Sequence, residues 1–246
     1  MTRVTIDSIS LRNAGIVTIA QHAKGHRFTL DSLLLADFCC LRPRARLLEI
    51  GAGTGVISIL LARKYPGISA TAVEIQPGSA DLCRWNAQVN GLGSRMTVIC
   101  SDIARARKTL GSVPFDVIIA NPPYTDPDAG KRSALTSRRI AREGGAGTLR
   151  TWLETASLLK NRGRFCLIYP APRLTELATL LRSRRLEPKR LRFVHPSSHK
   201  NAAFVLIEAV RSAGSGAEIL PPLVLHQDRG SFSKELQEIY AVPESM

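Results

Sequence analysis

Apolar and polar positions from residue 46 onward alternate between short runs typical of strands and longer runs with helical spacing. Strands are predicted at Arg46–Ile50, Ser69–Glu74, Met96–Cys100, Phe115–Ala120, Gly163–Tyr169, Arg190–His195 and Ala203–Val210. Helices are predicted between most of them, at Val56–Lys64, Gly78–Asn90, Ile103–Leu110, Leu149–Leu159 and Arg173–Arg182. Such alternation implies parallel strands with right-handed crossovers, so we expect an α/β fold with helices on both faces of one sheet.

The connection between the last two predicted strands is different. Only the polar turn 196–201 separates them, which is too short for a helical crossover. We therefore expect these two strands to form an antiparallel hairpin at the edge of the sheet. Residues 46–210 are predicted to form the main domain, residues 1–45 an N-terminal lead-in helical segment with a helix over 28–38, and residues 211–246 a C-terminal tail.

Composition excludes several classes of protein. No stretch approaches the roughly 18 consecutive apolar residues that a membrane span requires, and the first ten residues lack the apolar centre of a signal peptide. We therefore expect a cytoplasmic protein. The five cysteines lie in apolar segments without metal-ligand spacing, so we expect buried, reduced thiols and no metal site. Nothing in the sequence indicates the oligomeric state.

The positive charge is unevenly placed along the chain. The whole chain carries a formal charge of +14, and residues 131–200 contain 17 basic and 4 acidic residues. A basic block of this kind attracts a polyphosphate backbone through its field and through counterion release. It favours a nucleic-acid partner, although a solubilising surface would have the same composition.

A glycine-rich segment from Leu47 to Gly55 ends the first predicted strand and begins the first helix. Glycines at 51, 53 and 55 let the backbone turn tightly and approach a ligand that any Cβ would displace. A dinucleotide fingerprint G-x-G-x-x-G would need a further glycine at 56 or 58, where the chain has Val56 and Ser58. The segment therefore favours a nucleoside-type cofactor other than NAD or FAD.

Acidic residues follow the next two predicted strands. Glu74 ends the second strand, 19 residues beyond Gly55, where its carboxylate can accept hydrogen bonds from ribose hydroxyls. Asp102 follows the third strand, where it can accept from an adenine amine while Ile103 packs on the ring. One such acid is more often a helix cap or a solvated loop residue. Successive strand ends that each carry the expected chemistry predict a nucleoside pocket.

The fourth predicted strand ends in Asn121-Pro122-Pro123-Tyr124. The prolines restrict the backbone after Asn121, so its side-chain oxygen and the Pro122 carbonyl can be held rigidly. Two such acceptors suit an amine on an sp² carbon, and Tyr124 offers a flat face for stacking. An ordinary turn would also be rich in Asn and Pro. The position at the end of a strand in the same sheet favours a catalytic role.

With these residues in place, the chain resembles the class I S-adenosylmethionine-dependent methyltransferases, which have a Rossmann-like seven-stranded sheet, mostly parallel with an antiparallel C-terminal hairpin. The motif at 121–124 is similar to the (Asn/Asp/Ser)-Pro-Pro-(Tyr/Phe/Trp) motif of their amino-methylating group. The resemblance spans residues 28–210 and implies S-adenosyl-L-methionine as cofactor. The cofactor-binding residues it implies are Glu49, Gly51, Ala52, Gly53, Gly55, Glu74, Ile75, Asp102, Ile103 and Asn121.

The layout is most similar to bacterial tRNA adenine-N6 methyltransferases that modify the adenine beside the anticodon of a valine tRNA. The short lead-in 27–36 joins the core directly, a basic segment follows the catalytic motif, and the chain ends soon after the hairpin. This resemblance implies tRNA as the partner, methylation at adenine N6, and phosphate contacts from Lys131, Arg132, Arg138, Arg139 and Arg142. The five cationic residues could instead form a solvated helix face.

Three other readings remain open. N5-methylation of a glutamine in a protein such as a release factor uses the same motif, but the 45 residues before the core are few for a helical substrate domain. Guanine-N2 methylation of ribosomal RNA and adenine-N6 methylation of DNA are also possible, although no extra target-recognition domain is evident. A non-catalytic RNA-binding protein would have no use for the acidic residues and the Asn-Pro-Pro-Tyr motif.

Overall fold

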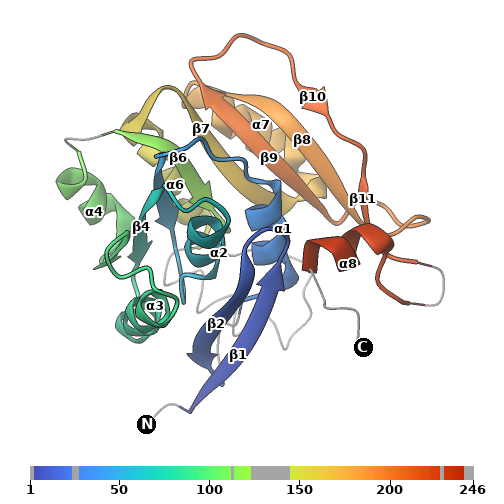
Figure 1. Ribbon diagram of the computed structural model, residues 1–246. Helices are drawn as coiled ribbons and strands as arrows, with labels where there is room; N and C mark the ends of the chain where they lie inside the picture. The colour runs from blue at the N-terminus through green and yellow to red at the C-terminus, as the bar shows by residue number, and fades with distance from the viewer. Residues whose placement is uncertain (1–2, 24–27, 112–113, 123–144, 228–229, 241–246) are drawn as a thin grey trace.

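A nine-stranded sheet forms the centre of the molecule (Figure 1). The computed structural model describes residues 3–23, 28–111, 114–122, 145–227 and 230–240. Along the sheet the strands follow the order β10-β8-β9-β7-β6-β3-β4-β5, and β11 also pairs with β8. The α/β fold expected from the alternation of strands and helices is confirmed.

Four strands and one helix have the predicted bounds: β3 Arg46–Ile50, β4 Ser69–Glu74, β5 Met96–Cys100, β6 Phe115–Ala120 and α2 Val56–Lys64. Two strands are longer than predicted, β7 Leu159–Pro170 and β8 Leu186–Ser197, and β9 Phe204–Arg211 is shifted by one residue from the prediction. The other helices of the core are α1 Leu30–Phe38, α3 Pro77–Val89, α4 Ile103–Thr109 and α7 Leu174–Ser183. Instead of one helix at 149–159, the structure has α6 Gly145–Leu153 followed by the 3-10 helix η1 Glu154–Leu158. A second 3-10 helix, η2, covers Ala171–Arg173.

The C-terminal hairpin is confirmed, but it does not form the outer edge of the sheet. Strands β3 to β7 pair in parallel, whereas β9 is antiparallel to both β7 and β8 and lies between them. Two short strands, β10 Glu218–Ile219 and β11 Leu223–His226, then pair in parallel with β8. The seven predicted strands therefore form a larger sheet together with part of the C-terminal segment.

The N-terminal segment differs from the predicted helical lead-in. Residues 4–22 form an antiparallel hairpin of β1 Val4–Leu11 and β2 Gly15–His22, and only α1 is helical as expected. The turn between the strands has Asn13 at φ +64° and Gly15 at φ +71°, and both residue types tolerate this left-handed region. Apolar side chains on both faces of β1 hide the period-two pattern that would have revealed the strand.

The C-terminal segment packs on the core. Helix α8 Lys234–Tyr240 buries Leu236 and Ile239 in the same apolar cluster as residues of α1 and β1. The main chain of Ile239 accepts a hydrogen bond of 2.9 Å from the Arg12 amide. The tail at 211–246 therefore joins the fold of the main domain through β10, β11 and α8.

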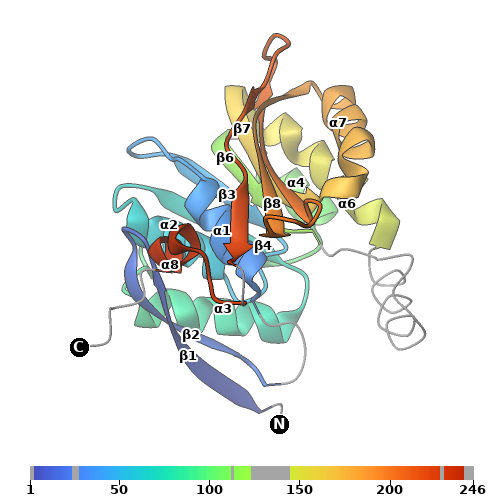
Figure 2. The same cartoon turned by 90° about the vertical axis from the view of Figure 1, so that its right-hand side faces the viewer.

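Helices cover both faces of the sheet (Figure 2). One face packs against α1, α2 and α3, joined by the N-terminal hairpin and α8, and the other packs against α4, α6 and α7. Because β3 and β6 are buried on both faces, most of their side chains are apolar, as is usual for central parallel strands; the exceptions are Arg46 and Glu49 in β3 and Asp116 in β6.

The five cysteines are free thiols, as expected, but two of them are not buried. Cys39, Cys83 and Cys166 lie in the interior, whereas Cys40 and Cys100 are exposed. The expectation of burial was wrong for these two because Cys40 follows the end of α1 and Cys100 ends the edge strand β5. Among the described residues no group of three or more metal-ligating side chains is found, and no helix is long and apolar enough to cross a bilayer.

Candidate active site

The sheet brings the predicted site residues to one edge. Ile50 of β3 pairs with Val73 of β4 and with Ala120 of β6 in the same register. Gly51, Glu74 and Asn121 therefore follow three adjacent residues of neighbouring strands. Because parallel strands end at the same edge, side chains far apart in the sequence meet there.

The glycine loop has the left-handed backbone that its composition predicts. Gly51, Gly53 and Gly55 have φ of +64°, +55° and +82°. A Cβ on Gly53 would meet nothing within 4 Å, so the loop is open on that side. A Cβ on Gly55 would lie 2.4 Å from Sγ of Cys83, so this glycine is required by the packing of α3. The loop thus offers a ligand an open stretch of backbone at Gly53.

Glu74 holds the glycine loop in place. Its Oε2 accepts a hydrogen bond of 2.8 Å from the Gly53 amide, and its Oε1 accepts one of 2.8 Å from the Gln76 amide. Only 5% of the residue is exposed. Each carboxylate oxygen can accept more than one hydrogen bond, so these contacts are compatible with ribose hydroxyls as additional donors.

Asn121 lies between β6 and helix α1. Its Nδ2 donates a hydrogen bond of 3.3 Å to Oγ of Ser32, a residue of α1 with 6% exposure. Asn121 is half-buried and Pro122 is buried. The Ser32 hydroxyl orients the Asn121 carboxamide, whose oxygen is the hydrogen-bond acceptor that the predicted role requires.

Several predicted residues lie outside the described part of the chain. They are Pro123, Tyr124, Lys131, Arg132, Arg138, Arg139 and Arg142. Their roles remain predictions from the sequence.

A family match accounts for this arrangement. The methyltransferase small domain family matches residues 22–147, which include the glycine loop, Glu74, Asp102 and Asn121. The chain belongs to this family. It is a methyltransferase, as predicted, and its methyl donor is S-adenosylmethionine.

Relatives agree over most of the chain. A protein of Flavobacteriaceae bacterium (strain 3519-10) named tRNA1(Val) (adenine(37)-N6)-methyltransferase is 32% identical over 199 residues, covering 75% of this chain and 82% of its own length. A protein of the same name from Porphyromonas gingivalis (strain ATCC 33277) is 31% identical and covers 85% of both chains. A crystal structure of a predicted O-methyltransferase from Agrobacterium tumefaciens superposes with a TM-score of 0.69 at 21% identity, covering 86% of this chain and 96% of its own. That likeness supports the methyltransferase fold.

The residues at the strand ends of this methyltransferase fit the cofactor. Gly53 has open space where a side chain would stand, and the Glu74 carboxylate lies beside it. Ile75, directly after Glu74, is 53% exposed and gives the same edge an apolar side chain suited to a purine ring. Ala52 is 6% exposed and donates its amide to the Val73 carbonyl, so its part is to shape the loop.

Glu49 occupies the interior. The residue is 2% exposed, and its Oε2 accepts a hydrogen bond of 2.9 Å from the Ser58 amide in α2. Burial, with a smaller contribution from the nearby Glu74 carboxylate, raises the pKa of the Glu49 carboxyl to about 7 against the weaker opposing effect of the hydrogen bonds with Ser58. The contact that the structure shows joins β3 to α2, and a contact with the cofactor remains a prediction.

Asp102 and Ile103 lie at the start of α4. Asp102 is exposed, and its Oδ1 accepts a hydrogen bond of 2.7 Å from the Ala104 amide as an N-cap. Ile103 is 7% exposed and belongs to the apolar cluster that contains Ile50 and Val73. Capping uses one carboxylate oxygen of Asp102, so an additional contact with an adenine amine is compatible with it.

Two residues that sequence reasoning missed also shape the site. The Trp152 indole of α6 lies so close to Gly51 that a Cβ there would be 2.4 Å from its ring. Asn86 of α3 is fully buried and donates a hydrogen bond of 2.9 Å from Nδ2 to the carbonyl of Thr54 in the glycine loop. No local pattern marks either residue, because each reaches the loop through tertiary packing.

Asn86 also connects the loop to the N-terminal hairpin. Its Oδ1 accepts a hydrogen bond of 2.7 Å from the Ala20 amide, and its Nδ2 donates one of 3.0 Å to the Ala20 carbonyl. Asn90, one turn later, pairs in the same way with the amide and carbonyl of Thr18 at 3.0 and 2.7 Å. Two side-chain amides thus take the place of a neighbouring strand along the free edge of β2.

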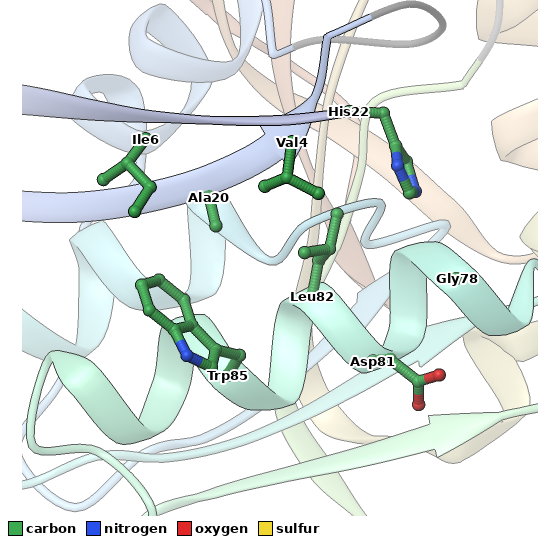
Figure 3. Close-up of a pocket in the computed structure, with 8 residues that line it drawn as sticks. All are labelled: Val4, Ile6, Ala20, His22, Gly78, Asp81, Leu82 and Trp85. Carbon is green, nitrogen blue, oxygen red and sulfur yellow. The ribbon is translucent and has the colours of Figure 1, made fainter. Parts of the chain in front are cut away.

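A hollow of about 400 Å³ lies away from the glycine loop, between the N-terminal hairpin and α3 (Figure 3). Ile6, Val4 and Ala20 line it from the hairpin, and Leu82 and Trp85 line it from α3. None of the residues predicted to bind the cofactor or the amine is among its lining residues. The hollow is therefore separate from the candidate active site.

Part of the basic block is used inside the fold. Glu208 of β9 is 8% exposed and forms ion pairs of 3.3 Å with both Arg164 and Arg190. Lys160 pairs with Asp116 at 2.7 Å. The charge excess of residues 131–200 is therefore not one continuous surface for a nucleic acid.

Proposed function

We propose that this methyltransferase transfers a methyl group to the exocyclic N6 amine of an adenine in tRNA. The position of Asn121 carries the proposal, because it follows β6 beside the glycine loop and is oriented by Ser32. The names of the two relatives above, which specify adenine 37 of a valine tRNA, support the substrate. A tRNA substrate would also place the reaction in the cytoplasm, and free thiols agree with a reducing compartment.

The chemistry needs acceptors more than a strong base. An amine on an sp² carbon shares its lone pair with the ring and is a poor nucleophile. Acceptance of its two hydrogens by the Asn121 side-chain oxygen and the Pro122 carbonyl would return electron density to the nitrogen. S-adenosylmethionine supplies an activated methyl group, so positioning and electrostatics can provide the rate enhancement.

The structure supports a rigid pair of acceptors. Pro122 is buried, and its ring restricts the backbone directly after Asn121. Ser32, the partner of the Asn121 amide, is itself buried in α1 and held by the packing of that helix. Stacking of the extruded base on Tyr124 completes the proposal and remains a prediction from the sequence.

The substrate is tested by incubating the protein with labelled S-adenosylmethionine and, separately, total RNA, genomic DNA and a release factor. Mass analysis of the digested nucleosides and peptides then identifies the product. We expect N6-methyladenosine in the tRNA fraction. Methylated glutamine, N2-methylguanosine or label confined to DNA would each replace the proposal with the corresponding alternative.

The acceptor role is tested by Asn121→Ala, for which we expect a loss of turnover of at least about 10²-fold with little change in cofactor affinity. Asn161→Ala is the matched control, because Asn161 is exposed near the start of β7, the end of that strand opposite the candidate site. If Asn121→Ala retains most of the turnover, Asn121 has no part in amine activation.

The predicted basic segment has a separate test. Replacement of Arg138, Arg139 and Arg142 with Ala should weaken RNA binding and flatten its dependence on salt while cofactor affinity is unchanged. An unchanged salt dependence would assign these side chains to the solvated surface.

A further inference from the structure

We infer that the edge of the sheet opposite the active site is a second contact surface for the phosphate backbone of the substrate RNA. This inference rests on the proposed RNA substrate. Three exposed arginines carry it: Arg44, Arg162 and Arg185. Arg44 precedes β3, Arg162 lies near the start of β7 and Arg185 precedes β8, so the three arginines belong to three different strand regions.

The sheet register places the three arginines at one level. A single row of paired residues crosses five strands, in the order Leu47, Val117, Arg164, Val210 and Glu187. Arg44 precedes this row by three residues of chain, and Arg162 and Arg185 each precede it by two. All three therefore lie at the edge of the sheet where the parallel strands begin. In Figure 1 this is the edge from which the loop between β9 and β10 extends.

The spacing along this edge suits a phosphate backbone. One strand, β6, separates β3 from β7, and one strand, β9, separates β7 from β8. Because neighbouring strands are roughly 4.8 Å apart, consecutive arginines stand roughly 10 Å from one another. Three cations in such a row can each contact a phosphate of the same RNA.

The backbone at these positions is unusual for arginine. Arg44, Arg162 and Arg185 have φ of +59°, +62° and +59°, a region where glycine or asparagine is the ordinary choice. Arginine gains nothing from this conformation, and its Cβ makes it unfavourable. Because this backbone conformation recurs at three arginines of the same edge, we attribute the arginine side chains there to their charge.

All three arginines are exposed in the part of the chain that the structure describes. Within the described residues, none of the three side chains has a hydrogen bond or an ion pair. Two acids at this level of the sheet already have other partners, since Asp116, next to Val117, pairs with Lys160 and Glu187 pairs with Arg182. An added polyanion would therefore meet uncompensated positive charge at this edge.

The surface is remote from the reacting base. Seven residues separate Arg44 from Gly51 along β3, which at about 3.3 Å per residue is a distance of roughly 20 Å. A short stem-loop placed in the active site would not cover both edges. A full-length tRNA is long enough to do so, and this difference separates the proposed surface from the active-site edge.

The test combines Arg44→Asn, Arg162→Asn and Arg185→Asn in one variant and measures the Kd for full-length tRNA and for a short anticodon stem-loop from 50 to 300 mM salt. For tRNA we expect an affinity loss of roughly tenfold to a hundredfold at 150 mM salt, and a log–log salt slope lower by about 2 to 3. For the stem-loop we expect almost no change. The melting temperature should be equal or higher, because asparagine tolerates the left-handed backbone.

A matched control removes the same number of charges elsewhere, through Arg3→Gln, Arg84→Gln and Lys234→Gln, which replace exposed residues of the N-terminal segment, α3 and α8. A tRNA salt slope equal to that of this control would overturn the inference. So would an equal loss for the stem-loop, because it would place the contact at the active-site edge. Methylation of DNA or of a release factor instead of RNA would remove the proposed function, whichever result the binding gives.

Discussion

Glu49→Gln should stabilise the protein above neutral pH and change nothing in acid. Burial raises the pKa of the Glu49 carboxyl from its usual value of 4.5 to about 7. Between these values the unfolded chain loses the proton while the folded protein keeps it, so the folded state binds more protons. Its stability then falls as pH rises from about 4.5 to 7 and stays low above that range. A glutamine cannot ionise and does not have this dependence.

The magnitude follows from the shift. A difference of about 2.5 pKa units corresponds to at most about 3 kcal/mol at full ionisation. The glutamine oxygen can still accept the hydrogen bond from the Ser58 amide, so α2 keeps this contact. We expect the variant to exceed the wild type by about 1 to 3 kcal/mol at pH 8 and to match it near pH 4.5.

Urea denaturation of the cofactor-free protein at several pH values between 4.5 and 8.5 measures this difference. Glu238→Gln, an exposed substitution on α8, is the matched control and should leave the free energy of unfolding within about 0.5 kcal/mol at each pH. A Glu49→Gln gap that stays constant across this pH range would refute the reasoning. The same variant tests the predicted cofactor contact, because a purely structural Glu49 leaves the Kd for S-adenosylhomocysteine nearly unchanged.

Three further tests separate the parts of the site. Gly51→Ala should destabilise the loop and weaken cofactor binding by more than Gly53→Ala does. Both glycines have positive φ, but only a Cβ on Gly51 would clash with Trp152, at 2.4 Å. Equal losses of the two variants in thermal melting and in cofactor titration would contradict this expectation. Asn86→Leu should lower the free energy of unfolding by about 3 kcal/mol or more, because it removes three buried hydrogen bonds between the Asn86 side chain and backbone groups. A urea midpoint near that of the wild type would be inconsistent with these hydrogen bonds. Glu74→Gln removes an acceptor from one of two amides and should weaken cofactor binding at least about tenfold by calorimetry, whereas an unchanged Kd would exclude the ribose role.

Local sequence was enough to predict the central strands. Both β3 and β6 are short, mostly apolar runs, and their bounds in the structure are those predicted. Strands buried on both faces have this composition wherever they occur, so no knowledge of their partners is needed. The glycine loop, Glu74 and Asn121 follow from the same reasoning, because the end of a parallel strand defines an edge.

The N-terminal hairpin was not predictable in this way. Val4 and Ile6 point to one face of β1 and are exposed, while Ile9 and Leu11 are buried on the other. The strand therefore has no consistent alternation, and its stability depends on β2 and on the amides of α3. Asn13 and Gly15, which form its turn with positive φ, were the available signal.

Charge shows the same division between sequence and structure. The count of charged residues located a basic block at 131–200. In the structure, Arg164 and Arg190 of this block pair with the buried Glu208, whereas Arg162 and Arg185 are exposed. The count alone could not distinguish these two groups. Whether an arginine faces an acid or solvent depends on strand register, which is set by pairing between distant segments.

The sequence by itself determined the central strands, the glycines of the loop and the acidic and amide groups at the strand ends, because each depends on a few consecutive residues. Only the tertiary structure decided that Ser32 orients Asn121, that Trp152 lies against the loop, and that Asn86 joins the loop to the hairpin. These contacts connect residues 32 to 101 positions apart, and a contact over such a distance is fixed by packing and not by local pattern.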